Sequence, residues 1–273
     1  MAAPRPRSDS NVVAAVRGGK SSAPRSKPAR GGRQSGGAWE SLRALLSTVL
    51  VFLVIRTFLV EAFRIPSGSM IPTLLVGDWL FVNKLVYGPH IPFTKINLPG
   101  YAEPKRYDVV VFVSPYQADE AERGNDPTPT LVKRLWGTPG DTLYMRDALL
   151  YVNGVPQPQG EAMAANPKGD PNETHELFEW QRRYALAASR FGAAPAQPTH
   201  DNWGPIVVPA GHYFMLGDNR YNSKDSRYWG IVPRANLRGR PLFVYYSYNA
   251  DDSDRALPFI TDVRWGRIGH TIR

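Results

Sequence analysis

The hydrophobic positions divide the chain into a polar beginning, one long apolar run and a body of short apolar runs. The long run, residues 44–60, reads ALLSTVLVFLVIRTFLV, with Arg56 as its single charge. Seventeen residues are the short end of a membrane-spanning helix, and the long side chain of Arg56 can reach the membrane surface. A buried core helix and a cleaved signal peptide are the alternatives. The pattern favours one span, which we assign to residues 41–63.

The body that follows alternates short apolar runs with clusters of Gly, Pro, Asn and Asp, which is typical of strands joined by turns. Residues 108–113 (DVVVFV) are apolar after the first position, as expected for a core strand. Asn153-Gly154 stands between two apolar runs and predicts a hairpin. The predicted strands cover residues 79–86, 108–113, 130–136, 148–152, 155, 206–208, 213–216 and 242–248.

Residues 156–205 interrupt this pattern. Within them, residues 173–191 carry apolar side chains at helical spacing and charges between, which predicts one amphipathic helix. These apolar positions are Leu177, Trp180, Tyr184 and Leu186. The pattern is compatible with a helix that packs on the body and with one that contacts a substrate or a membrane.

Charge is unevenly placed along the 273 residues. Residues 1–37 hold eight Lys or Arg against one acid, Asp9, so they carry seven of the nine net positive charges. A basic tail can bind nucleic acid, but this one precedes an apolar segment, where positive charge marks the cytoplasmic side. We therefore interpret the tail as a topology signal and expect no nucleic-acid partner. Cysteine is absent, which excludes disulfides and cysteine-ligated metals.

Three polar segments carry candidate chemistry. Residues 65–70 read IPSGSM, Lys133-Arg134 precedes a GTPGD turn, and residues 217–230 read GDNRYNSKDSRYWG. A serine hydroxyl is a poor nucleophile until a base removes its proton. None of the five histidines lies in a recognisable serine-protease context, and neither G-x-S-x-G nor H-E-x-x-H occurs. Lysine is the base that remains.

Lys133 is placed for that role inside a predicted strand. Strand alternation sends Lys133 and Arg134 to opposite faces, so that one can point inward while the other stays solvated. Burial against apolar groups lowers the pKa of a lysine, because the charged form loses its hydration. A Lys-Arg pair is also an ordinary feature of an edge strand, and the strand alone does not decide between the two interpretations.

Taken together, the three segments resemble the type I signal peptidases, which are membrane-anchored serine proteases with a serine–lysine dyad. The resemblance covers residues from about 42 to 232. By position, it implies that Ser69 is the nucleophile and Lys133 the general base. It also implies that the Ser67 hydroxyl joins the Ser69 backbone N–H in an oxyanion hole, and that Ser223 orients the lysine amine.

The resemblance further marks residues that shape the site without reacting. Asp225 and Arg227 match a structural ion pair, and the loop at 217–220 matches one that packs beside the dyad. The structural residues implied near the site are Asp218, Asn219, Arg220, Asp225 and Arg227.

The fold implied by the resemblance is mainly β. It is the antiparallel coiled sheet that signal peptidases share with the SOS-repressor proteases, with one N-terminal transmembrane helix and a small inserted helix. The chain then divides into a disordered basic cytoplasmic tail (1–40), a transmembrane helix (41–63), a catalytic domain in two parts (64–155 and 206–273) and a variable insertion (156–205). The 156–205 insertion is where the resemblance is weakest.

The implied activity is removal of N-terminal signal peptides after small residues, in an A-x-A pattern, without a metal or organic cofactor. The expected partners are signal-peptide-bearing preproteins, the lipid bilayer and the secretion translocase. The expected location is the bacterial inner membrane, with one span, a cytoplasmic N-terminus and the catalytic domain on the periplasmic side. Two alternatives stay open: a related peptidase dedicated to one substrate, such as a pilin-like protein, and an inactive membrane-tethered binding module.

Overall fold

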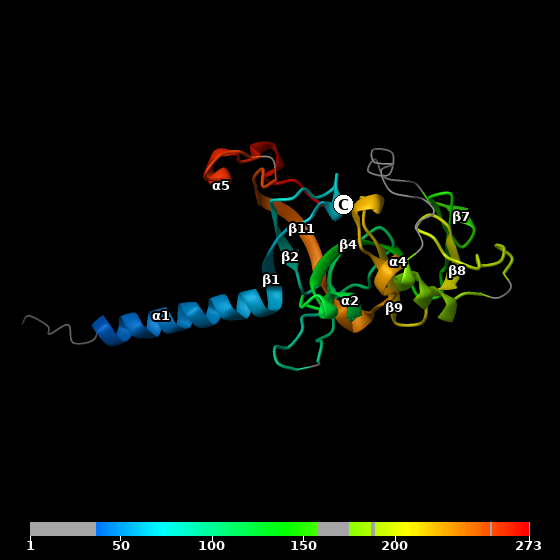
Figure 1. Cartoon of the computed structure of the whole chain (residues 1–273). Coiled ribbons are helices and arrows are strands. Elements are labelled where there is room, and N and C mark those ends of the chain that lie inside the picture. Colours follow the sequence, from blue (N-terminus) through cyan, green and yellow to red (C-terminus); the bar gives the residue numbers. More distant parts are fainter. Residues whose placement is uncertain (1–36, 95, 158–174, 187–188, 252, 273) are drawn as a thin grey trace, which may run out of the picture. The chain divides into compact units, whose positions relative to one another are not determined.

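The computed structural model describes residues 37–94, 96–157, 175–186, 189–251 and 253–272 (Figure 1). The predicted tail at 1–40 lies almost entirely outside the described residues. The chain forms two units, up to Leu45 and from Leu46 onward. Of the first unit, the structure describes only the beginning of a helix, and the second unit holds all the strands.

The apolar run forms α1 (Gly37–Val54), which continues as one turn of π-helix at Ile55–Leu59. The 21 residues Trp39–Leu59 are long and apolar enough to cross a membrane. The helix predicted to reach residue 63 ends at Leu59, so that boundary was wrong. Val60 is extended (φ −137°, ψ 136°) and begins strand β1 (Val60–Arg64), whose backbone pairs with β2. Hydropathy does not distinguish an apolar strand that directly follows an apolar helix from the helix itself.

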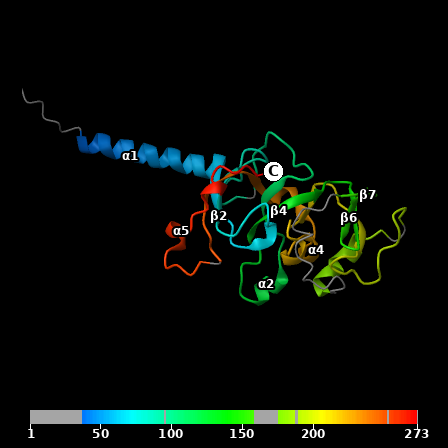
Figure 2. The same ribbon diagram turned by 90° about the horizontal axis from the view of Figure 1, so that it is seen from above.

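The body is mainly β, and every paired strand is antiparallel to its partner. A seven-stranded sheet has the order β1-β2-β11-β3-β4-β9-β10, and a four-stranded sheet has the order β7-β6-β5-β8. In both views the four-stranded sheet lies at the end of the body away from β2 (Figures 1 and 2). The remaining strands of the large sheet are β2 (Asp78–Asn83), β3 (Val109–Val113), β4 (Thr130–Gly137), β9 (His212–Leu216), β10 (Val232–Pro233) and β11 (Leu237–Ser247). Those of the small sheet are β5 (Thr142–Arg146), β6 (Leu149–Val152), β7 (Val155–Pro156) and β8 (Trp203–Val207).

The strand predictions are confirmed, with differences at their ends. The predicted hairpin is β6 and β7, and both Asn153 and Gly154 have the positive φ that a tight hairpin turn requires. β11 begins five residues earlier than predicted, at Leu237, because its first half pairs with β3 and its second half with β2. β8 and β9 are consecutive in sequence but belong to different sheets.

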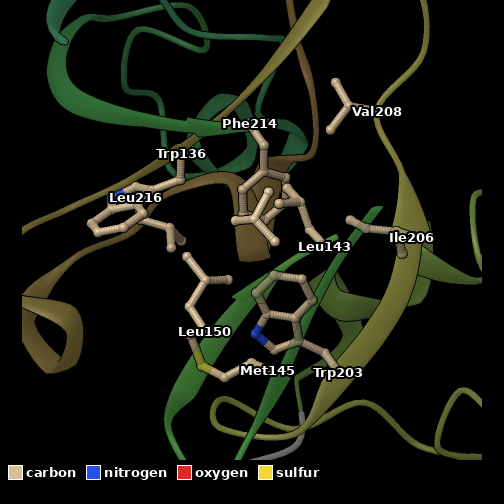
Figure 3. Close-up of a cluster of buried hydrophobic side chains, with 10 residues drawn as sticks. Trp136, Leu143, Met145, Leu150, Trp203, Ile206, Val208, Phe214 and Leu216 are labelled. Carbon is tan, nitrogen blue, oxygen red and sulfur yellow. The ribbon is translucent and has the colours of Figure 1, made fainter. Parts of the chain in front are cut away.

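The two sheets meet at a cluster of buried side chains (Figure 3). β4 and β9 contribute Trp136, Phe214 and Leu216, and the small sheet contributes Leu143, Met145, Leu150, Trp203 and Ile206. A second cluster, which includes Ile65, Met70, Leu80 and Val244, lies under the segment between β1 and β2. The IPSGSM segment is therefore anchored in a core.

The inserted helix differs from its prediction. Within the described residues it is a 3-10 helix at Glu176–Arg183, shorter than the predicted 173–191. Phe178 is buried and Trp180 packs on the cluster of Figure 3, so the helix packs on the body at these positions. The other short helices are α2 (Ala118–Glu122), α4 (Ser226–Trp229) and α5 (Pro258–Thr261), with 3-10 turns at Gly68–Met70, Arg220–Asn222, Arg234–Asn236 and Trp265–Arg267.

The C-terminal segment after β11 returns to the turn before β2. Arg267 donates to both carboxylate oxygens of Asp78, at 3.0 and 2.6 Å, and to the Thr73 carbonyl at 3.0 Å. Ile272 enters the same core cluster as Met70. The last residues of the chain thus stabilise the segment that leads from Met70 to β2.

Candidate active site

Ser69 lies in the 3-10 helix Gly68–Met70, between β1 and β2. Ile65 and Met70 are buried on either side of it and hold this turn in the core. Burial of a side chain such as that of methionine stabilises by about 1.5–3 kcal/mol. Ser69 is itself only 8% exposed, so its hydroxyl is held in place and largely screened from solvent.

Lys133 lies within β4 and reaches Ser69 across 64 residues of sequence. Its Nζ is 2.6 Å from Ser69 Oγ, and the residue is only 3% exposed. The pairing of Lys133 with Val110 of β3 fixes its position along the sheet. At this distance a proton can pass directly between the serine hydroxyl and the amine.

Burial lowers the pKa of Lys133 from 10.5 to about 8. The carboxylates of Asp225 and Asp218 oppose this shift, and the Arg227 charge adds to it. At neutral pH about a tenth of the amines are then uncharged, compared with well under a thousandth for an ordinary lysine. A neutral amine beside a serine hydroxyl can act as a base.

Arg134 points to the other face of β4, as strand alternation predicts. Its guanidinium binds both carboxylate oxygens of Asp218, at 2.8 and 2.6 Å, and donates to the Tyr107 carbonyl. The Thr73 hydroxyl donates to the same carboxylate at 2.6 Å. Arg134 therefore ties β4 both to the 217–220 loop and to the segment after Met70.

The 217–220 loop packs directly on the serine turn. The Asn219 backbone N–H donates to the Ser69 carbonyl and its side-chain amide donates to the Gly68 carbonyl, both at 3.1 Å. Gly217 has no room for a side chain, because a Cβ there would lie 2.6 Å from the Ser69 carbonyl oxygen. Burial and the Arg227 charge lower the pKa of Arg220 to about 10, and its guanidinium stacks over the Trp136 ring.

Asp225 and Arg227 form a fully buried ion pair with two contacts of 2.8 Å. Burial opposes ionisation of Asp225, but the Arg227 charge and hydrogen bonds hold the pKa of the carboxyl below its usual value. Asp225 also accepts the Gly217 N–H at 3.1 Å, and Arg227 donates to the Arg220 carbonyl at 2.6 Å. The pair thus fixes the loop that contacts Ser69.

Sequence reasoning missed a histidine–aspartate pair in the insertion. His200 and Asp201 are both buried, with His200 Nδ1 2.5 Å from Asp201 Oδ1. The other ring nitrogen of His200 meets a guanidinium nitrogen of Arg227, and the Tyr221 hydroxyl donates to Asp201 at 2.7 Å. Trp180 donates to the Arg227 carbonyl at 2.9 Å. The insertion is therefore part of the support of the site, and no local pattern in the sequence indicated it.

The two remaining predicted serines are placed differently. Ser67 is exposed, with extended backbone, just before the 3-10 helix. Ser223 is buried beside the dyad, but its hydroxyl makes no hydrogen bond with any residue that the structure describes. The predicted contact between Ser223 and the Lys133 amine is therefore not formed here. Among the described residues no three His, Cys, Asp or Glu side chains are grouped to hold a metal ion.

Two cavities meet at the dyad. The narrow one, of about 60 Å³, lies between residues 63–67 and the first half of β4. The wide one, of about 500 Å³, has a charged and aromatic wall from α2, the insertion and the segment around Lys224. Ser67, Ser69 and Lys133 line both cavities. A peptide that passes from one cavity to the other would cross the Ser69 hydroxyl.

Comparisons with known proteins identify the family. The family described as "Signal peptidase, peptidase S26" matches residues 38–246. The chain is 36% identical to a signal peptidase I of Pseudomonas aeruginosa over 76% of this chain and 72% of that protein. It is 30% identical to that of Aquifex aeolicus, over 74% and 82%. A signal peptidase I structure from Enterococcus faecalis is 30% identical, covers 50% of this chain and 96% of its own, and superposes with a TM-score of 0.30. The chain belongs to the signal peptidase family, peptidase S26.

Proposed function

We propose that this protein is a type I signal peptidase, a serine endopeptidase that removes N-terminal signal peptides from exported preproteins after small residues. Family membership gives the class of activity. The assignment of the catalytic residues rests on the 2.6 Å contact between Ser69 Oγ and the Lys133 amine. This amine is buried, its pKa is lowered, and it lies where the two cavities meet.

In the proposed reaction, the neutral Lys133 amine takes the Ser69 proton as the serine oxygen attacks the scissile carbonyl. The C–N bond then breaks, and the lysine ammonium returns that proton to the leaving amine, which becomes the new N-terminus. Water, deprotonated by Lys133, attacks the resulting ester. The bond between the acyl carbon and Ser69 Oγ breaks, the lysine ammonium returns the proton to Ser69, and the signal peptide leaves as a carboxylate. The Ser69 N–H and the Ser67 hydroxyl are proposed to stabilise the oxyanion in both steps.

The sheet offers a place for an extended substrate. On one edge of β4, β3 pairs with the strand from Thr130 onward. On the other edge, β9 pairs only with the second half, from Arg134 to Gly137. Among the described residues, the first half of β4 therefore has no paired strand on the β9 side. The narrow cavity runs beside the first half of β4, on the side of Ser67. We propose that the cleavage region of the preprotein adds to this edge as a strand. The small volume of this cavity fits alanine-sized side chains before the cut.

The membrane arrangement is part of the proposal. Residues Trp39–Leu59 would cross the bacterial inner membrane once, with the basic tail in the cytoplasm by the positive-inside rule. The catalytic domain would then begin at Val60 on the outer side, where the substrate also leaves the bilayer. Contact with the secretion translocase remains a prediction.

The assignment can be tested with the purified full chain in detergent and a preprotein that carries an A-x-A site. We expect cleavage directly after that site, identified by sequencing the new N-terminus, and none with Ser69→Ala. Cleavage only of one dedicated precursor would favour the specialised peptidase. A folded wild type that neither cleaves nor is acylated by a serine-directed inhibitor would favour the binding module.

Activity should depend on pH in the direction set by Lys133. Because the neutral amine is the base and burial lowers its pKa to about 8, kcat/KM should fall as pH drops through about 8 and level off above it. The measurement is kcat/KM for an A-x-A peptide across neutral and alkaline pH. A profile that is flat through this range would contradict the proposed role of Lys133.

Ser67→Ala should slow cleavage with little change in stability, because the Ser67 side chain is exposed. Loss of a typical oxyanion-hole donor raises the barrier by about 2.7–4 kcal/mol, which is roughly a hundredfold to a thousandfold in kcat. Ser67→Thr, which keeps a hydroxyl, is the matched variant and should retain more activity. An unchanged kcat for Ser67→Ala would remove this residue from the oxyanion hole.

A further inference from the structure

A third cavity, of about 420 Å³, lies where the apolar helix passes into the sheet. Its charged lining consists of Arg56 from the end of the helix, Glu61 from β1, Lys84 just after β2 and Arg238 from β11. The Lys84 N–H donates to the Leu59 carbonyl at 2.9 Å, which holds the end of β2 against the end of the helix. The helix end, the neighbouring strands β1, β2 and β11, the loop at His90 and Pro92, and Thr130 of β4 together enclose the cavity.

The cations in this cavity outnumber the acids. Glu61 pairs with Lys84 at 3.1 Å, which accounts for one positive charge. Within the described part of the chain, neither Arg56 nor Arg238 forms an ion pair. The hydrogen bonds of Arg238 run from Nη1 to the carbonyls of Ala235 and Leu237. Two guanidinium groups thus face one cavity whose single lining carboxylate, Glu61, is already paired with Lys84.

Burial makes the unpaired charge of Arg238 costly. It lowers the pKa of Arg238, an effect that Glu61 only partly offsets. A charge removed from water is stabilised when an opposite charge and hydrogen bonds replace the lost hydration. Guanidinium groups bind phosphate with two parallel hydrogen bonds, so a phosphate monoanion or diester is the chemistry that this cavity fits best.

The apolar part of the lining indicates where such a phosphate would come from. Leu53 belongs to the apolar helix, and Pro92 belongs to the loop whose tip, Phe93, is fully exposed. A free phosphate would gain nothing from these side chains, whereas a phospholipid places its acyl chains beside them. Because this helix is proposed to span the bilayer, the cavity would lie at the level of the lipid headgroups.

We propose that this cavity binds the phosphate of an anionic phospholipid at the membrane surface, with Arg56 and Arg238 as its principal contacts. The inference rests on the membrane arrangement under the proposed function. Phe63 and Thr130 line both this cavity and the narrow one that leads to Ser69. The bound headgroup would therefore occupy the membrane end of the path along which the preprotein approaches the dyad.

The test is lipid retention by the full chain in detergent micelles, measured by native mass spectrometry and independent of cleavage. The probes are phosphatidylglycerol, phosphatidylcholine with the same acyl chains, and inorganic phosphate. We expect one phosphatidylglycerol to be retained in preference to the other two. Arg56→Gln and Arg238→Gln should each weaken its binding about tenfold, the effect of losing one charged hydrogen-bond partner.

Arg240→Gln is the matched control, because Arg240 lies two residues along β11 and pairs with Asp108 at 3.2 Å. It changes the net charge equally and should leave retention within about twofold. Arg56 is exposed at the helix end, so Arg56→Gln keeps the test valid if Arg238→Gln fails to fold. Equal retention of phosphatidylcholine, equal loss with Arg240→Gln, or equal binding of inorganic phosphate would overturn the proposal. If the wild type retained the lipid but did not cleave preproteins, that result would instead count against the proposed function alone.

Discussion

Replacing Lys133 by alanine is expected to abolish cleavage, with kcat lower by roughly 10⁴- to 10⁶-fold, the range seen when one member of a catalytic unit is removed. Lys133 Nζ lies 2.6 Å from the Ser69 hydroxyl and is the proposed base, so removal of the amine would leave that hydroxyl protonated. Lys133→Arg should fail equally, because a guanidinium stays protonated and cannot accept the proton. The measurement is single-turnover cleavage of an A-x-A peptide.

Two further variants show whether the loss of activity is specific to Lys133. Lys105→Ala removes an exposed lysine and should leave the rate unchanged. Ser69→Ala combined with Lys133→Ala should be no slower than either single variant, because the two residues act as one unit. If Lys133→Arg kept substantial activity, proton transfer to the lysine could not be the way in which Ser69 is activated.

The second large effect is on stability, and it comes from the buried pair of Asp225 and Arg227. Arg227→Ala should lower the free energy of unfolding by about 3–5 kcal/mol, because it leaves the Asp225 carboxylate buried without its partner. The loop at 217–220 should loosen with it, since Asp225 accepts the Gly217 N–H and Asn219 contacts the Ser69 carbonyl. Urea unfolding followed by fluorescence would measure the change.

A double substitution tests whether Asp225 and Arg227 stabilise the protein as a coupled pair. Asp225→Leu with Arg227→Met removes both charges and should cost less than the sum of the single changes. Glu179→Ala breaks the exposed pair with Arg182 and should change stability little. Additive losses at Asp225 and Arg227 would show that the pair is not coupled, and the ion pair would no longer explain the order of the loop.

Local patterns were sufficient to predict most of the strands and one hairpin turn, but not β1, β5 and β10. β3 is a continuous apolar run, the hairpin of β6 and β7 has its Asn-Gly turn, and alternation along β4 separates Lys133 from Arg134. Each of these depends on neighbouring residues alone. The end of the apolar helix was wrong by four residues because β1 is defined by its partner strand rather than by its own composition.

Contacts between segments that lie far apart in the sequence could not be predicted. His200 and Asp201 support Arg227 from the insertion, and Arg267 reaches Asp78 from the far end of the chain. β8 and β9 join different sheets although a short turn connects them. The expected contact of Ser223 with Lys133 came from the resemblance, and the structure places the Ser223 hydroxyl nearby without that hydrogen bond. In each case the partner is selected by the packing of the whole domain.

The most direct test of the Ser69–Lys133 dyad is to treat the full chain with a serine-directed acylating inhibitor and to locate the adduct by peptide mass mapping. We expect one acyl group, on Ser69, formed rapidly by the wild type and by Lys105→Ala but not by Lys133→Ala. An adduct on another residue, or acylation of Ser69 at an unchanged rate without Lys133, would contradict the proposed dyad.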